Sequence, residues 1–164
     1  MSHTSSRLRQ VMDWRAAVLA GLVAGLVFLL FQLIATSIVL GESPWIVLNQ
    51  IAAIVLGPAG LVDSFALNPA AFILGLLIHF LFSILFTLLL AFIIHRWGLA
   101  VGIIGGALFG LALYGLNYYA FARLFTLTWF SGMRSAYVIL AHIVFGAVAG
   151  GVYEALEKDI YVAE

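Results

Sequence analysis

The chain has 164 residues, of which 65% are hydrophobic and only 9% are charged, and its formal net charge is zero. Soluble domains carry charge on about a quarter of their residues, so this composition predicts an integral membrane protein with the lipid bilayer as its solvent. The zero net charge and the lack of a nucleic-acid-binding motif argue against a nucleic-acid partner. The sequence has no cysteine, which excludes disulfides, thiolate metal sites and cysteine nucleophiles.

Polar ends flank a long apolar region. Residues 1–15 contain three arginines and no apolar periodicity, and they predict a cytoplasmic N-terminal tail without regular structure. Residues 157–164 predict a short cytoplasmic C-terminal tail, and residues 16–156 between them form the predicted transmembrane domain. Its apolar runs are long enough to cross about 30 Å of hydrocarbon as helices. The four predicted spans cover about residues 16–40, 70–95, 98–121 and 134–156.

The first outer loop, residues 41–69, holds all three prolines. A helix over about 44–56 is predicted between a Ser-Pro start and a Gly-Pro stop. It is too short to cross a bilayer, so we expect it in the outer interface with Trp45 as an anchor and with Asn49 and Gln50 turned to polar surroundings. A re-entrant pore helix is the alternative. The predicted fold is therefore all-α: a four-helix membrane bundle with one additional interfacial helix.

The positions of lysine and arginine predict the orientation of the chain. With the N-terminus inside, the cytoplasmic segments carry Arg7, Arg9, Arg15, Arg96 and Lys158, whereas the outer loops carry only Arg123 and Arg134. Cytoplasmic loops of membrane proteins are enriched in these residues, which favours an arrangement with both termini inside. The first span is longer than the apolar region of a secretory signal, so we expect it to be retained.

Glycines recur at intervals of four in three of the predicted spans. Residues four apart share one helix face, and small residues there let two membrane helices approach closely. The expected helix-packing positions are Gly21, Gly25, Gly98, Gly102, Gly106, Gly110, Gly146 and Gly150. Because a single bundle need not use every such face internally, a homo-oligomer or a larger membrane complex is also expected.

Each span contributes one polar side chain at a similar depth in the outer half of the membrane. At about 1.5 Å of rise per residue, these side chains lie about 10–13 Å below the outer ends of their spans. They are Gln32, His79, Tyr114 and His142, which we call the polar layer, and Asn117 and Tyr118 lie one turn further out.

Several roles remain open for the polar layer. Its side chains could satisfy one another in a structural network that fixes helix register, or they could bind a small molecule, a lipid headgroup or a quinone. His79 and His142 could also supply the two axial imidazoles of haem b. A metal site is disfavoured because no carboxylate lies at this depth. No cofactor is required by the sequence.

The sequence also resembles a known group of proteins. The segments SPWIVLNQIAAIVLGP (43–58), LLIHFLFSILF (76–86) and LAHIVFGAVAGGVYEAL (140–156) resemble short uncharacterised bacterial four-span inner-membrane proteins. These are sometimes labelled sodium:proline symporters and are distantly similar to the YagU-like family. The resemblance covers about residues 16–156 and implies a bacterial cytoplasmic (inner) membrane, four spans and a shared His79–His142 pair, but no established activity.

The sequence contains no phosphate-binding loop, no HExxH motif and no nucleophile elbow, so an enzyme is not predicted. We expect a non-enzymatic accessory or envelope-associated membrane protein. One alternative is an electron-transfer protein that binds haem b or a quinone through His79 and His142. A second alternative is a component of an oligomeric transporter or channel.

Overall fold

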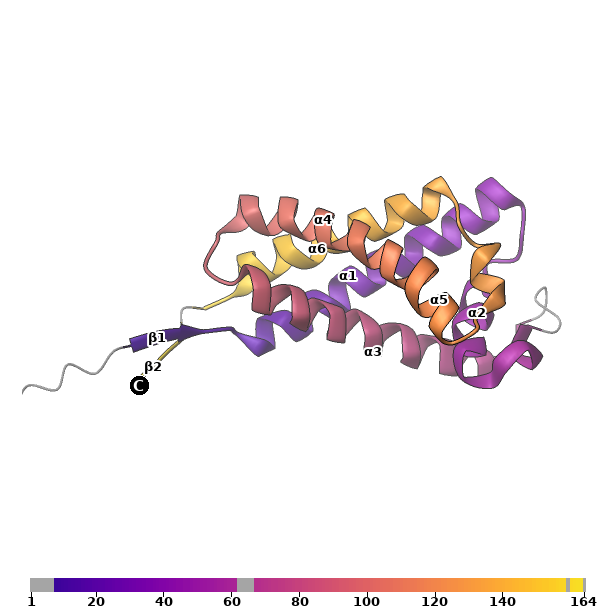
Figure 1. Ribbon diagram of the computed structural model, residues 1–164, viewed down its shortest axis with the longest axis horizontal. Helices are drawn as coiled ribbons and strands as arrows, with labels where there is room; N and C mark the ends of the chain where they lie inside the picture. Colours follow the sequence, from indigo (N-terminus) through magenta and orange to yellow (C-terminus); the bar gives the residue numbers. More distant parts are fainter. Residues whose placement is uncertain (1–7, 62–66, 159, 164) are drawn as a thin grey trace, which may run out of the picture.

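The computed structural model of the chain describes residues 8–61, 67–158 and 160–163. Long apolar helices run side by side along the molecule, with both ends of the chain at the same end of the bundle (Figure 1). Four helical segments are long and apolar enough to cross a membrane: Trp14–Leu40, Pro69–Ile94, Leu99–Leu124 and Ala136–Leu156. The predicted all-α fold with four spans is confirmed, and the observed ends lie within a few residues of the predicted ones.

The first span is α1 (Trp14–Ala35), which continues into a π-helical turn over Thr36–Leu40. Asp13 caps its start, because the Asp13 Oδ1 atom accepts hydrogen bonds from the backbone N–H groups of Arg15 (3.0 Å) and Ala16 (3.2 Å). Such a cap satisfies donors that have no partner within the helix. The Asp13 Oδ2 atom also accepts from the backbone N–H of Lys158 at 3.3 Å, which ties the beginning of the bundle to its end.

The short helix α2 (Trp45–Leu56) is followed by a 3-10 turn over Gly57–Leu61. The second span, α3 (Pro69–Ile94), begins with Pro69 in the first turn and with Asn68 as its cap. Proline suits this position because its missing N–H needs no partner there.

The third span combines three helical segments: α4 (Leu99–Gly115), a π-helical segment over Leu116–Phe121, and the single turn α5 (Ala122–Leu124). A 3-10 turn over Thr128–Ser131 leads to the fourth span, α6 (Ala136–Leu156). The sequence predicts one regular helix over 98–121, so the π-helical segment over Leu116–Phe121 is a finding of the structure.

The predicted tails are partly ordered, which corrects the expectation of irregular structure. Strand β1 (Leu8–Val11) pairs antiparallel with strand β2 (Ile160–Ala163), with Val11 opposite Ile160. β-Branched and aromatic residues favour strands, and the IYVA sequence of β2 is rich in them. Residues 1–7, 159 and 164 of the predicted tails lie outside the described residues.

Helices α4 and α6 pack closest, through glycines on both. A Cβ atom built at Gly106 would overlap the carbonyl of Gly146, and one at Gly146 would overlap the carbonyl of Gly106. Gly110 meets the carbonyl of His142 in the same way. Nearer the chain termini, a Cβ atom at Gly102 would lie 2.9 Å from the carbonyl oxygen of Gly150. The backbones therefore touch directly, as expected from small residues at intervals of four.

Gly98 is the exception among the predicted packing glycines. It precedes α4 with a φ of +82°, and a Cβ atom there would meet nothing within 4 Å. Its backbone N–H instead donates to Glu154 Oε2 of α6 at 3.0 Å. A carboxylate at a helix N-terminus satisfies a free N–H and the helix dipole, so Gly98 and Glu154 form a cap between two helices.

The glycines of α1 face a different helix. A Cβ atom at Gly21 would lie 2.8 Å from Ile84 Cα, and one at Gly25 would lie 2.7 Å from Ser83 Oγ, so both glycines pack against α3. All three predicted glycine faces are thus used within the chain. The surplus of packing faces, on which the expected homo-oligomer was based, is therefore removed.

The packing order of the spans is α3, α1, α6, α4: each helix lies along the next, whereas α3 and α4 make few contacts with each other. The half of the bundle near the termini is filled by a core of α1 alanines and of larger side chains from α3 and α6, including Leu90, Ile94 and Tyr153. The bundle is therefore closed at this end and opens along one side toward the other end.

Helix α2 lies at the end opposite the termini (Figure 1) and packs mainly against α3. A Cβ atom at Gly75 of α3 would overlap the carbonyl of Leu48, so the two backbones are in contact there. Asn49 is only 2% exposed, which corrects the expectation that it faces polar surroundings. Its position follows from the burial of the face of α2 that contains Leu48, Asn49 and Ala52.

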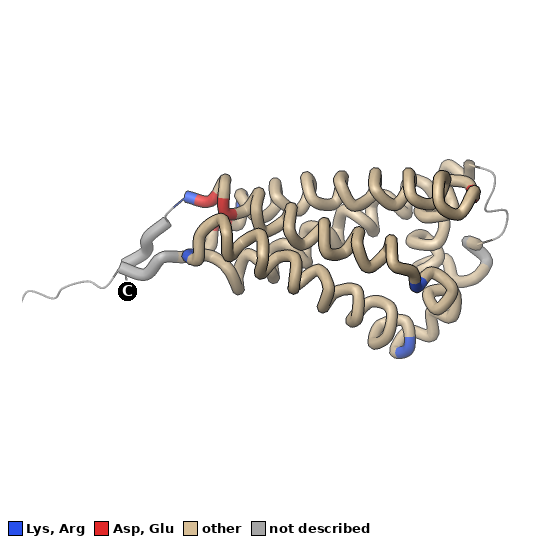
Figure 2. Tube along the Cα trace, turned by 90° about the horizontal axis from the view of Figure 1, so that it is seen from above, with Lys and Arg blue, Asp and Glu red and all other residues tan. Residues whose placement is uncertain are grey.

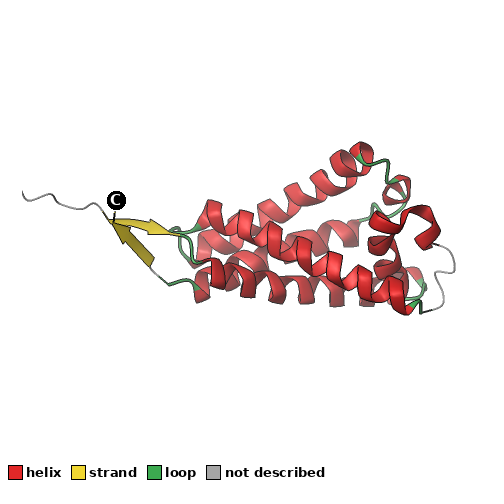
Figure 3. Ribbon diagram, turned by 90° about the horizontal axis from the view of Figure 1, so that it is seen from below, coloured by secondary structure: helices red, strands yellow, loops and turns green. Residues whose placement is uncertain are grey.

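Charged residues lie at the two ends of the bundle and leave its long middle without charge among the described residues (Figure 2). Seen from below, the helices diverge toward the end that carries the loops, while the strand pair extends from the other end (Figure 3). This distribution places a wide uncharged band around the helices, as a bilayer requires.

Candidate functional site

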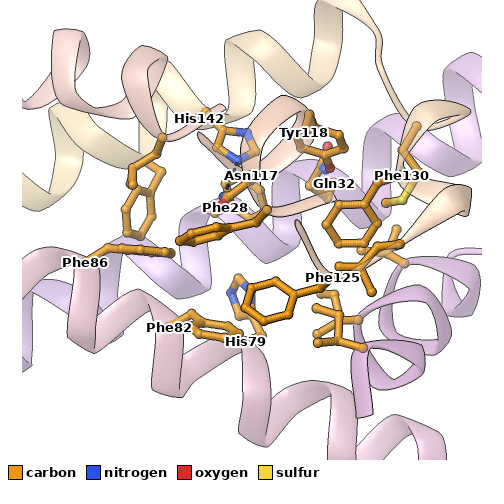
Figure 4. Close-up of a pocket in the computed structure, with 18 residues that line it drawn as sticks. Phe28, Gln32, His79, Phe82, Phe86, Asn117, Tyr118, Phe125, Phe130 and His142 are labelled. Atoms are coloured by element: carbon orange, nitrogen blue, oxygen red, sulfur yellow. Dashed lines mark hydrogen bonds between the residues drawn. The ribbon is translucent and has the colours of Figure 1, made fainter. Parts of the chain in front are cut away.

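The diverging end of the bundle encloses a cavity of about 640 Å³. This volume lies within the roughly 300–1,000 Å³ range of small-molecule sites. Its wall comes from all four spans, from α2 and from the segment after α5, and it is mainly aromatic (Figure 4). The phenylalanines that line it are Phe28, Phe82, Phe86, Phe121, Phe125, Phe130 and Phe145.

Five polar residues also line the cavity: Gln32, His79, Asn117, Tyr118 and His142. All except Asn117 are buried, with 3% to 8% of the residue exposed. Three of the four residues of the predicted polar layer are therefore brought together at one cavity. The fourth, Tyr114, lies behind the wall, where its ring stacks on Tyr118 with centroids 5.0 Å apart.

His79 is fixed by a glycine of the neighbouring helix. Its Nε2 atom lies 2.8 Å from the carbonyl oxygen of Gly25. A carbonyl only accepts, so this ring nitrogen carries the proton and donates. The close approach of α1 to α3 at Gly25 brings the carbonyl within reach. The other nitrogen, Nδ1, is left as an acceptor and has no hydrogen-bond partner among the described residues.

His142 is fixed by its own helix. Its Nδ1 atom donates to the carbonyl oxygen of Val138, one turn earlier, at 2.8 Å. The remaining Nε2 atom is therefore an acceptor, and Asn117 Nδ2 approaches it with a long contact of 3.5 Å. His79 Nδ1 thus keeps an unused lone pair, and the lone pair of His142 Nε2 is engaged by this long contact alone.

Gln32 contributes an amide whose hydrogen-bonding capacity is unused. Its Oε1 atom is fully buried and has no hydrogen-bond partner in the part of the chain that the structure describes. Buried polar atoms in proteins are paired in the large majority of cases, so Gln32 leaves an unsatisfied acceptor beside the cavity that it lines.

The polar layer is therefore not the closed structural network considered from the sequence. His79 bonds to a backbone carbonyl of α1, His142 bonds to a backbone carbonyl of α6, and the Gln32 oxygen is unpaired. The long Asn117–His142 contact is the one side-chain pair among these described residues. Hydrogen-bonding capacity consequently remains for a bound molecule.

Phe28 of α1 lies between the two imidazoles (Figure 4). Its ring stacks on His79 at a centroid distance of 5.6 Å and meets His142 edge-on at 4.9 Å. Two axial haem ligands must face each other across an iron, at roughly 2 Å from it on each side. With Phe28 between the rings and His79 Nε2 bonded to Gly25, these residues do not fit a haem held by both histidines.

No cluster of three or more histidine, aspartate or glutamate side chains that could hold a metal ion occurs within the described residues. The cavity wall itself contains no Asp, Glu, Lys or Arg among the residues that line it. Because a charge buried in an apolar site is costly unless it is paired, this wall suits an uncharged molecule.

The cavity opens sideways, between α3 and the segment that follows α5. Phe82 and Phe125 line the cavity and yet are 39% and 62% exposed, which marks them as its mouth. Figure 4 shows both rings on the side of the cavity near His79 and away from His142. The few contacts between α3 and α4 leave this side uncovered. In a bilayer, such a mouth faces lipid.

Sequence reasoning placed Asn117 and Tyr118 one turn further out than the polar layer and missed Phe28 as a site residue. The π-helical segment Leu116–Phe121 holds one more residue per turn than a regular helix needs, and it turns Asn117 and Tyr118 to the cavity. A polar asparagine within an apolar span was the available signal for the first, but nothing in the sequence distinguishes Phe28 from other phenylalanines.

Comparison with protein families, with curated proteins and with solved structures finds no match to this chain. The resemblance to four-span bacterial inner-membrane proteins therefore stays a prediction. The structure by itself establishes four apolar helices that are consistent with a multi-pass membrane protein, and within them a laterally open aromatic cavity with unpaired polar atoms.

Proposed function

We propose that this chain is a non-enzymatic accessory protein of a bacterial inner membrane that binds an uncharged, lipid-soluble molecule in its cavity. The observation that carries the proposal is a largely aromatic cavity with five polar residues, Gln32, His79, Asn117, Tyr118 and His142, in its wall. An apolar cavity with a few convergent polar atoms is typical of a small-molecule site.

The lateral mouth supports a route from the bilayer. A molecule dissolved in the membrane reaches the cavity between Phe82 and Phe125 without crossing water. The uncharged wall favours neutral molecules over phospholipid headgroups, because a phosphate there would lie far from any compensating charge. The ligand is therefore expected to have an apolar body and a neutral polar head.

The orientation belongs to the same proposal. Pairing of β1 with β2 brings both termini to one end, which also carries Arg15, Arg96 and Lys158. The opposite end carries Arg123 and Arg134. By the excess of positive charge, the terminal end is cytoplasmic and the cavity lies in the outer half of the membrane.

The test is a cavity-filling substitution with a matched control on the same helix. Ile54 lines the cavity, whereas its neighbour Val55 is 66% exposed and points away from it. Native mass spectrometry of protein purified in mild detergent should detect a bound apolar molecule in the wild type and in Val55→Trp. It should be lost in Ile54→Trp, because the indole occupies the cavity.

Equal occupancy of both tryptophan variants would contradict the proposal. So would a wild-type protein that carries no apolar molecule and takes up none from added membrane lipid. Thermal unfolding of both variants provides the control for folding.

A further inference from the structure

The histidines of the cavity are both locked as hydrogen-bond acceptors. His79 gives its only proton to the carbonyl of Gly25, and His142 gives its only proton to the carbonyl of Val138. Neither ring can present an N–H to the cavity without breaking a bond of 2.8 Å to a backbone oxygen. A polar ligand atom that faces either histidine must therefore be a donor, which in a neutral molecule means an O–H or N–H group.

Gln32 adds a third polar group to the cavity wall. The three residues come from three different helices, α1, α3 and α6. The amide can present either its oxygen or its NH₂ group, so it adapts to the ligand. Asn117 and Tyr118 of the wall can likewise donate or accept, so discrimination between a donor and an acceptor on the ligand comes from the histidines, which only accept.

The space around these acceptors suits a flat ring. Phe28 lies against both imidazoles, so a head group that reaches both of them must lie beside this ring. Phe82, Phe86 and Phe130 complete the aromatic surroundings (Figure 4). Aromatic rings pack favourably on one another in stacked and edge-on arrangements, which favours an aromatic head over a compact alcohol.

The mouth of the cavity leaves room for an apolar chain attached to the ligand's ring. Phe82 and Phe125 are exposed on the side of the bundle, where a hydrocarbon substituent passes from the cavity into lipid. A ligand with two O–H groups on an aromatic ring and one apolar chain uses every feature of the site: the acceptors, the phenylalanines and the opening.

We infer that the cavity binds a hydroquinone with a hydrocarbon chain, in its neutral reduced form and in preference to the corresponding quinone. The inference rests on the proposed ligand-binding function and names its chemical class. In the quinone both ring oxygens are carbonyls, so they face the lone pairs of His79 and His142 instead of bonding to them. Sites built to bond a hydroxyl strongly reject analogues that lack it, because the site's buried polar atoms are left unpaired.

Three probes with the same ring and chain test this inference under anaerobic conditions: decylhydroquinone, decylbenzoquinone and the dimethyl ether of decylhydroquinone. Their partition between protein-loaded and empty nanodiscs gives the apparent affinity of each. We expect the wild type to bind the hydroquinone at least ~10-fold more tightly than the other two, in line with the cost of an unmade buried hydrogen bond.

Two variants test whether His142 contributes to the preference for the hydroquinone. His142→Phe keeps an aromatic side chain of similar shape but removes one of the two histidine acceptors, so its preference for the hydroquinone should be smaller than that of the wild type. His95→Phe is the control, because His95 lies at the cytoplasmic end and its Nδ1 atom bonds only to the carbonyl of Phe92. It should keep the wild-type preference.

The possible results distinguish failure of the hydroquinone preference from failure of the proposed ligand binding. Quinone or ether binding as tight as hydroquinone binding by the wild type would overturn the ligand class while leaving a cavity that binds apolar molecules. Binding of none of the probes above the level of empty nanodiscs would overturn both. The wild-type comparison decides the ligand class even where His142→Phe does not fold.

Discussion

A methyl group at Gly106 should destabilise the protein, although it improves the intrinsic helix propensity. Alanine is better than an interior glycine by about 1 kcal/mol in a helix. The Cβ atom would, however, overlap the carbonyl of Gly146, which belongs to the backbone and cannot rotate away. Overpacking costs about 1–3 kcal/mol, and a backbone obstacle places this site at the upper end. The expected net loss is about 1–2 kcal/mol.

Gly115→Ala is the matched control, because it lies on the same helix and a Cβ atom there would meet nothing within 4 Å. It should leave stability unchanged or raise it slightly. The assay is unfolding of the purified protein by sodium dodecyl sulfate in mixed micelles, followed by circular dichroism. Equal stability of Gly106→Ala and Gly115→Ala would refute the reasoning.

A double variant gives a second check on the same contact. Gly106→Ala should already force α4 and α6 apart. Gly146→Ala should then lower the free energy of unfolding by less than it does alone, because both methyl groups obstruct the same close approach. Strict additivity of the two losses would mean that the helices do not touch through these glycines.

Three further predictions concern other contacts. Glu154→Ala should lower stability by about 1 kcal/mol, because it removes the cap on the N–H of Gly98, whereas exposed Glu42→Ala should not; thermal unfolding of both decides. Gly75→Ala should push α2 away through the Leu48 carbonyl and weaken apolar-probe binding by the cavity that α2 lines; unchanged binding would contradict this arrangement. A reduced-minus-oxidised absorption spectrum should lack b-haem bands, and bands lost in both His79→Ala and His142→Ala would show that Phe28 moves aside.

Much of the fold follows from the sequence because membrane spans obey simple length and spacing rules. The common depth of Gln32, His79 and His142 followed from 1.5 Å of rise per residue, and the structure does bring these three to one cavity. Gly102, Gly106 and Gly110 were placed at a helix contact by their spacing alone, and the backbone contacts agree.

The remaining features depend on geometry that spacing does not encode. Gly98 continues the same interval of four but lies outside the helix, because its backbone adopts a positive φ. The π-helical segment shifts the helical phase and thereby turns Asn117 and Tyr118 to the cavity while Tyr114 lies behind it. The position of Phe28 between two histidines arises from the approach of three helices, which no local pattern describes.

The order in which the helices pack has a consequence for biogenesis. Helix α6 leaves the ribosome after the other three spans, yet it is the main partner of both α4 and α1. Until it is inserted, the glycine face of α4 lacks the helix against which it packs, and the alanine face of α1 is covered only in part, by side chains of α3. Synthesis proceeds at about 5–20 residues per second, so these faces wait for seconds within the membrane. The newly made protein therefore passes through a three-helix stage in which the insertion machinery or surrounding lipid must cover these surfaces.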